Sequence, residues 1–302
     1  MFGMDNQTGT FSLTNSWQWD LESASGDTYR IQISWPLGWS NRRPPVGRRV
    51  PVVYAVDGNA MFLTATEVVR RRAHSPNNSG GGIVVAVGYP LTRGVYEMKK
   101  RAFDLTPPGG ADTDGFGGAS AFLDFIAGVV RPFIQSTVFP GVEIDREAIF
   151  GHSYGGLFVL HSLFTRPQLF DCFIAASPSI YWNDRYILQE EREFRDTPSG
   201  ESKATLMIFF GSYEQNPPRW PDESSEHYRK RNRSARDRGM ADGAISMKER
   251  LLSSGKLQAV TLKEFPEEDH GSVVACALSR GLTSFLEGWP LTQSLGEAAE
   301  GE

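Results

Sequence analysis

One stretch of the sequence decides the fold, and it reads Ile149-Phe150-Gly151-His152-Ser153-Tyr154-Gly155-Gly156-Leu157-Phe158-Val159-Leu160. It holds the single G-x-S-x-G of the chain, formed by Gly151, Ser153 and Gly155. An apolar lead-in and a small-then-apolar continuation predict a strand that turns sharply into a helix, with the serine at the turn. Glycine on each side removes the Cβ atoms that would clash in a strained backbone. The pattern predicts a nucleophilic hydroxyl, with the Tyr154 N–H aimed at the group that it attacks.

The segments around this stretch alternate between buried strands and helices. Continuous apolar runs predict strands at 50–56, 83–87, 172–176, 205–210 and 260–265, with helices between them. Two earlier segments, 17–21 and 28–35, alternate apolar and polar residues around a Ser-Gly-Asp turn, which predicts an antiparallel hairpin. We therefore expect an α/β fold with one mostly parallel central sheet, antiparallel N-terminal strands and helices on both faces.

No change of composition divides the chain, so residues 1–302 are predicted to form a single domain. Two segments stand out within it. Residues 88–118 show no clear period and end in a Pro/Gly-rich run, which favours a wall or lid over a site, or else a surface excursion. Residues 216–240 form a basic insertion, whose run from Arg229 to Arg238 would either attract an anionic substrate or form a solvated helix face.

Composition excludes several classes of partner. A net charge of −5 argues against general nucleic-acid binding. The sequence contains no run of 18 apolar residues, so no membrane span is expected. The N-terminal residues lack the basic and apolar regions of a secretion signal, so a cytoplasmic location is expected. Cys172 and Cys276 fit reduced thiols better than a disulfide framework. A monomer and a homodimer both remain open.

A serine hydroxyl needs a base to remove its proton, and His270 is the candidate because it lies in a turn after the final predicted strand. The imidazole in turn needs an acceptor, for which Glu214 fits the chain order serine, acid, histidine. Asp184 is the alternative acid, and Asp269 is expected to face elsewhere. Ser153, Glu214 and His270 each follow a predicted strand, so we expect them to meet at one edge of the sheet.

The oxyanion that forms during acyl transfer needs two donors. One is the Tyr154 N–H, and the other is expected from the loop after the strand 50–56, at Gly58 or Asn59. His152, beside the serine, is expected to point away from it. No H-E-x-x-H, Cys/His cluster or nucleotide-binding glycine motif occurs, so no metal and no other cofactor is expected.

Several motifs together carry a resemblance to the putative-esterase family of α/β-hydrolases, and within it most to the siderophore esterases. They are YAVDGN at 54–59, RAFDLTP at 101–107, GHSYGG at 151–156, SPS at 177–179 followed by Trp182, and DHG at 269–271. The resemblance implies the α/β-hydrolase fold and a Ser153–His270 core. It also implies that Arg101 binds an anionic or carbonyl-rich substrate over the pocket, and that Trp182 lines the pocket.

The substrate that the resemblance implies is a small-molecule ester, a ferric tri-lactone siderophore of the triacetylfusarinine or enterobactin type. Its hydrolysis would weaken iron chelation and aid iron release within the cell. The residues themselves leave wider alternatives open. A general carboxylesterase, a thioesterase or an acyltransferase could use the same triad, and a binding protein could keep the fold without catalysis. From the residues alone, Arg101 is one of several cations in the segment 88–118 and could equally lie at the surface.

Overall fold

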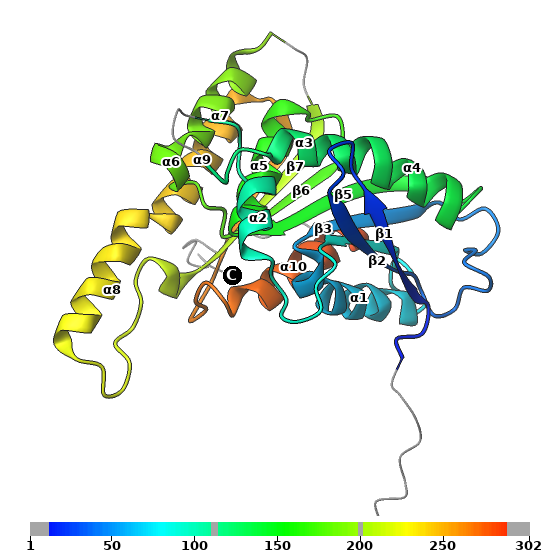
Figure 1. Cartoon of the computed structure of the whole chain (residues 1–302), viewed down its shortest axis with the longest axis horizontal. Helices are drawn as coiled ribbons and strands as arrows, with labels where there is room; N and C mark the ends of the chain where they lie inside the picture. The colour runs from blue at the N-terminus through cyan, green and yellow to red at the C-terminus, as the bar shows by residue number, and fades with distance from the viewer. Residues whose placement is uncertain (1–11, 110–113, 199–201, 289–302) are drawn as a thin grey trace, which may run out of the picture.

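The computed structural model describes residues 12–109, 114–198 and 202–288 (Figure 1). The strands are β1 (Ser16–Glu22), β2 (Thr28–Ser34), β3 (Val50–Val56), β4 (Ile83–Gly88), β5 (Ile144–His152), β6 (Cys172–Ala176), β7 (Ser202–Gly211) and β8 (Leu257–Phe265). The helices are α1 (Gly58–His74), α2 (Met98–Asp104), α3 (Ala119–Phe125), α4 (Arg131–Phe133), α5 (Tyr154–Thr165), α6 (Trp182–Arg185), α7 (Ile187–Asp196), α8 (Ser225–Arg238), α9 (Met240–Ser254) and α10 (Val273–Glu287). Two π-helical segments, η1 (Ile126–Val130) and η2 (Ile134–Val138), adjoin α4, and a 3-10 turn, η3 (Ser212–Glu214), follows β7.

The described strands form one sheet in the order β1-β2-β4-β3-β5-β6-β7-β8. The first two strands pair antiparallel with each other, and β2 pairs antiparallel with β4, whereas the neighbours from β4 to β8 are parallel. The predicted fold class is thus confirmed, including its antiparallel start. Since β5 lies between β3 and β6, the turn that follows it opens at the middle of the carboxyl edge, where sites in such sheets lie.

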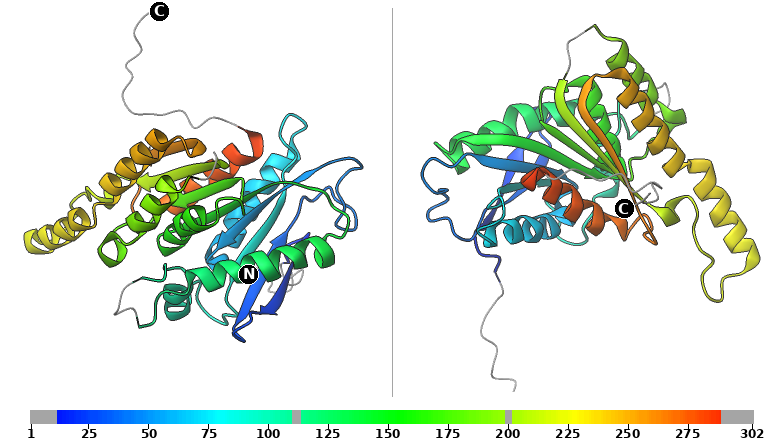
Figure 2. Two further views of the ribbon diagram at one scale, coloured as in Figure 1. Left: turned by 90° about the horizontal axis from the view of Figure 1, so that it is seen from above. Right: turned by 180° about the vertical axis from the view of Figure 1, so that it is seen from behind.

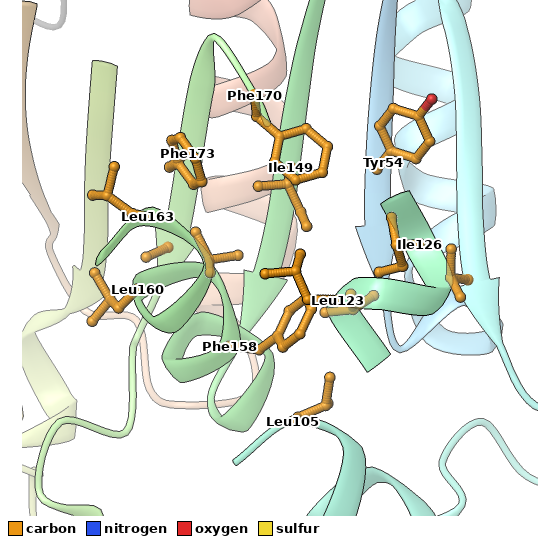
Figure 3. Packing of buried hydrophobic residues seen from close by; sticks show 14 of the residues in the cluster. Tyr54, Leu105, Leu123, Ile126, Ile149, Phe158, Leu160, Leu163, Phe170 and Phe173 are labelled. Atoms are coloured by element: carbon orange, nitrogen blue, oxygen red, sulfur yellow. The ribbon is translucent and has the colours of Figure 1, made fainter. Parts of the chain in front are cut away.

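Helices cover both faces of the sheet (Figure 2). One apolar layer lies between the sheet and the helices α1 and α10. The other lies on the opposite face of the sheet, under α5, α7, α9 and the helical segment that runs from α3 through η2. Figure 3 shows part of the second layer, in which Phe158 and Leu163 of α5 lie beside Ile149 and Phe173 of the sheet. All four side chains are fully buried, so both neighbours of the β5–α5 turn are held by the core.

The helical segment from Ala119 to Val138 contains two π turns, where the sequence predicts a plain helix over 119–134. Five of its buried residues recur every four positions: Phe122, Ile126, Val130, Ile134 and Val138. A repeat of four drifts by about 40° per step on an α-helix of 3.6 residues per turn. The wider π turns return the apolar side chains to the sheet. The segment has a mean hydropathy of 1.2 and is long enough to cross a membrane. This match is weak evidence for a membrane span, because a core helix that packs on a sheet also meets both conditions.

The segment 88–118 holds the helix α2, which its lack of a clear period does not predict. The Glu97 side chain caps this helix by accepting a hydrogen bond from the Lys100 N–H at 2.8 Å. The buried face of α2 consists of the charged residues Arg101 and Asp104. A search for apolar periodicity does not count such residues, which explains why the helix escapes it.

Candidate active site

Ser153 occupies a strained turn between β5 and α5. Its backbone has φ 60° and ψ −116°, a left-handed conformation that few residues other than glycine adopt. The neighbouring glycines make this turn possible, because a Cβ on Gly151 would lie 2.1 Å from the Gly155 carbonyl oxygen. A Cβ on Gly156 would lie 2.7 Å from the carbonyl oxygen of Ala176. The G-x-S-x-G-G sequence thus packs α5 tightly against β5 and β6 and leaves the Ser153 hydroxyl at the carboxyl edge.

The structure brings Ser153, His270 and Glu214 together in one chain of hydrogen bonds. The Ser153 Oγ lies 3.0 Å from the Nε2 of His270, and the Nδ1 of the same imidazole lies 2.6 Å from the Oε2 of Glu214. His270 comes from the loop between β8 and α10, and Glu214 from the turn after β7. A base positioned by a carboxylate next to a serine can activate that serine for attack on a carbonyl.

The Glu214 carboxylate is fixed by two further donors on its other oxygen. Its Oε1 accepts hydrogen bonds from the Ser177 Oγ at 2.6 Å and from the Gly211 N–H at 2.7 Å. Glu214 is buried, so each of these donors replaces solvation that the carboxylate has lost. Of the other predicted acids, Asp184 lies exposed on α6, and Asp269 accepts the N–H groups of Gly271 and Ser272. Ser177 was not singled out as a partner of the acid from sequence, because a serine in a turn carries no distinctive signal.

The predicted oxyanion donors lie at the starts of two neighbouring helices. Tyr154 is the first residue of α5, and Gly58 is the first residue of α1. The end of β3 adjoins α5, since a Cβ on Gly155 would lie 3.0 Å from the Val56 side chain. Asn59 uses its side chain elsewhere, donating to the Tyr89 carbonyl at 2.9 Å and accepting the Tyr89 N–H at 2.8 Å. It could therefore offer an oxyanion only its backbone N–H.

Arg101 is paired with Asp57, the residue before Gly58. Its Nε and Nη2 donate to the two carboxylate oxygens of Asp57 at 2.9 and 2.8 Å. Both side chains are buried, with 8% and 1% of their area exposed. The guanidinium also lies 5.5 Å from the centre of the Tyr154 ring. Arg101 therefore fastens α2 to the residue before Gly58, and a direct contact with substrate remains a prediction for it.

Trp182 is buried at the start of α6, and its ring centre lies 5.9 Å from that of Phe116. Phe116 in turn lies 6.5 Å, edge to face, from the ring of Tyr154. A run of aromatic contacts thus leads from Trp182 to the residue that follows the nucleophile. This places Trp182 near the site, and its contact with substrate remains a prediction.

His152 lies against the imidazole of His270, a contact that the sequence does not predict, while its orientation away from Ser153 remains a prediction. Its ring centre lies 4.5 Å from that of His270, with the rings tilted by 43°. Burial lowers the pKa of His152 from 6.5 to about 3, and the nearby His270 acts in the same direction. His152 is therefore a neutral ring that packs against the imidazole of His270. Strand alternation does not predict this contact, because His270 comes from the loop between β8 and α10, 118 positions further along the chain.

Substituting His152 by phenylalanine is expected to flatten the dependence of folding stability on pH. His152 is neutral when folded but titrates near 6.5 when unfolded, so the unfolded state binds the extra proton between about pH 3 and 6.5. The contribution of the neutral ring to the free energy of unfolding is therefore complete above pH 6.5. It falls by about 1.4 kcal/mol per pH unit as the pH is lowered from 6.5 toward 3. Urea unfolding at pH 7.0 and 5.0 would measure the difference. The same change at the exposed His74 should leave the slope intact, and a wild-type slope in His152→Phe would contradict the assignment.

The described residues hold no group of three or more His, Cys, Asp or Glu side chains placed to bind a metal ion. The groups that the site does bring together are the Ser153 hydroxyl, the His270 imidazole and the Glu214 carboxylate. Together they suit nucleophilic attack on an activated carbonyl carbon.

Comparison with known proteins agrees with this chemistry. A family model described as putative esterase matches residues 23–244, which is most of the chain. The chain belongs to the putative esterase family. The family predicted from the short motifs is thus confirmed.

This putative esterase is similar over nearly its whole length to several siderophore esterases. The siderophore triacetylfusarinine C esterase of Aspergillus fumigatus is 50% identical over 284 residues, which cover 93% of this chain and 97% of the relative. The siderophore enterobactin esterase of Emericella nidulans is 46% identical and covers 87% of this chain and 91% of the relative. Among solved structures, the siderophore hydrolase EstB from Aspergillus nidulans matches 95% of this chain and 100% of its own with a TM-score of 0.90, at 46% identity.

Proposed function

We propose that this putative esterase hydrolyses the ester bonds of a tri-lactone siderophore of the triacetylfusarinine or enterobactin type. The observation that carries the proposal is the hydrogen-bonded chain of Ser153, His270 and Glu214. The substrate class is supported by the 50% identity to a triacetylfusarinine C esterase over most of both chains.

The first half of the reaction forms an acyl-enzyme. As the Ser153 oxygen attacks the ester carbonyl, the Nε2 of His270 takes the hydroxyl proton, and Glu214 stabilises the imidazolium that results. The Tyr154 N–H and a backbone N–H of Gly58 or Asn59 would stabilise the negative oxygen of the tetrahedral intermediate. When the intermediate collapses, His270 returns the proton to the departing alcohol.

The second half repeats these steps with water. His270 removes a proton from a water molecule, the hydroxide attacks the acyl carbonyl, and the Ser153 oxygen leaves with the proton. The net change is one ester and one water to one carboxylic acid and one alcohol. In a tri-lactone, each cleavage removes part of the covalent frame that holds the three iron-binding arms in one molecule. The effective concentration of those arms around iron falls, which aids release of the metal.

We also propose that the reaction takes place in the cytoplasm, on a substrate that has been imported. Cys172 and Cys276 are both free thiols, which suits a reducing compartment. Cell fractionation with an antibody against the native protein would test the location. Recovery of the protein in the culture medium would contradict it.

The substrate is tested by incubating the enzyme with ferric triacetylfusarinine, ferric enterobactin and a short p-nitrophenyl ester, followed by mass spectrometry. The expected result is a kcat/KM for one siderophore far above that for the simple ester, with linear and monomeric products. Turnover of the simple ester alone would overturn the siderophore assignment and leave a general carboxylesterase or thioesterase. Transfer of the acyl group to an added alcohol in preference to water would indicate an acyltransferase.

A further inference from the structure

A hollow of about 320 Å³ reaches the triad from the side of α8. Its lining includes Glu214, Asp269, His270 and Gly271 from the catalytic loops, and Arg231 and Arg238 from α8. The basic insertion therefore contributes to a wall beside the catalytic base. Figure 1 shows α8 extending outward from the body of the molecule next to this edge of the sheet.

Most of the charged groups in this hollow already have partners. Arg231 donates to both oxygens of Glu223 at 3.0 and 2.8 Å, and its guanidinium lies 3.9 Å from the centre of the Trp220 ring. The N–H groups of Ser272 and Gly271 hold the pKa of Asp269 below its usual value, so this acid is ionised and bound to the start of α10. Glu214 is used by the triad.

Arg238 differs from these groups. Within the part of the chain that the structure describes, its only recorded hydrogen bond is that of its Nε with the Ser234 carbonyl at 3.3 Å. Both terminal nitrogens thus remain available to a ligand. The helix around it is strongly basic, since Ser225–Arg238 holds six Arg or Lys side chains and two acidic ones, in a protein with a net charge of −5. Arg238 is thus a cation that faces the hollow, with positive charge around it.

The reaction determines which part of an ester lies in this hollow. His270 returns its proton to the departing alcohol, so the alcohol portion has to lie against the imidazole that lines the hollow. In an ester built from hydroxy acids, that alcohol portion carries a carboxyl group of its own. In the closed ring every carboxyl group is esterified. After the first cleavage, one of them is a free carboxylate, on the alcohol side of the terminal ester.

We propose that Arg238 binds this free carboxylate and thereby directs the enzyme to the terminal ester of ring-opened, linear hydroxy-acid esters. The inference rests on the proposed function and deepens it, since it makes the linear acid a preferred second substrate. Each further cycle consumes one water and releases one hydroxy acid from the carboxyl end of the chain. Arg238 transfers no proton, and its guanidinium pairs with carboxylate through charge-assisted hydrogen bonds.

The test compares a linear siderophore trimer with its methyl ester, in which the charge is removed. The wild type is expected to prefer the acid by kcat/KM, and Arg238→Gln is expected to lower this preference about tenfold, mainly through KM. The matched control is Arg233→Gln, which removes the same charge from the same helix at a position outside the hollow and should keep the preference. An equal loss of the preference for the acid in both variants would show that the overall positive charge of α8 attracts the carboxylate. That result would overturn the assignment to Arg238. An absent preference in the wild type would also overturn it.

A second pair of esters separates this inference from the proposed function. In 3-acetoxybutanoate the carboxylate lies on the alcohol side, and in monoethyl succinate it lies on the acyl side. Arg238→Gln should reduce kcat/KM for 3-acetoxybutanoate relative to its methyl ester, with no such change for monoethyl succinate. If the enzyme shows this outcome but does not hydrolyse siderophores, the carboxylate-binding role of Arg238 is supported and the proposed substrate is overturned. Equal effects on both acids would overturn the placement of the alcohol portion beside Arg238.

Discussion

Replacement of Ser153 by alanine is expected to lower kcat for ester hydrolysis by about 10⁶-fold, and His270→Ala by a similar factor. The Ser153 Oγ and the His270 Nε2 lie 3.0 Å apart and act as one unit, because the hydroxyl attacks only while the imidazole takes its proton. Removing either partner therefore removes the covalent route. The activity that remains would come from binding and from the backbone donors.

This loss is measured with single variants and with the Ser153→Ala/His270→Ala double variant. The double variant is expected to be no slower than the single ones, since the second change removes a group that has already lost its function. Ser162→Ala is a suitable control, because Ser162 is a buried serine of α5, the helix that follows Ser153, and its Oγ donates a hydrogen bond to the Phe158 carbonyl. Retention of a hundredth of the activity in Ser153→Ala would place the nucleophile elsewhere.

Glu214→Gln is expected to lower kcat by about 10⁴-fold through the tautomer of the histidine. The Ser177 hydroxyl and the Gly211 N–H both donate to Oε1, so the oxygen of the new amide would occupy that position. Its NH₂ group would then face the Nδ1 of His270 and require that nitrogen to accept a hydrogen bond. The proton would move to Nε2, and an Nε2–H cannot take the proton of Ser153.

Steady-state kinetics together with ¹⁵N NMR of the histidine tautomer would test this explanation. Glu190→Gln offers a matched control, because Glu190 is also buried and lies 2.8 Å from the Nδ1 of another histidine, His161, outside the triad. That variant should keep kcat. A Glu214→Gln enzyme that retains a tenth of the wild-type kcat would show that the reaction does not depend on this acid.

The sheet, and the meeting of Ser153, Glu214 and His270 at one edge of it, could be predicted from the sequence because their signals are local. Strands buried on both faces appear as continuous apolar runs, and the hairpin of β1 and β2 alternates around its turn. Ser153 is marked by the glycines that its turn requires. Glu214 and His270 each follow a strand, and parallel strands bring their carboxyl ends to one edge.

The contacts that could not be predicted join residues far apart in the chain. Arg101 and Asp57 are separated by 44 positions, and neither sequence position indicates that both side chains are buried. The contact between the His152 and His270 rings depends on how the loop after β8 lies against the turn that holds Ser153. The π turns before β5 depend on fitting an apolar repeat of four residues to the sheet, which a pattern of helical spacing only approximates.

The pairing of Arg101 with Asp57 limits how substrate can enter. Any outward swing of α2 would remove Arg101 from Asp57 and leave a buried carboxylate without its partner, at a cost of about 3–5 kcal/mol. At equilibrium, such an opened form would account for fewer than about one molecule in a hundred. The ion pair therefore anchors α2, and turnover should not be limited by movement of this helix. The rate of substrate binding would then depend on diffusion into the site and not on a prior movement of α2.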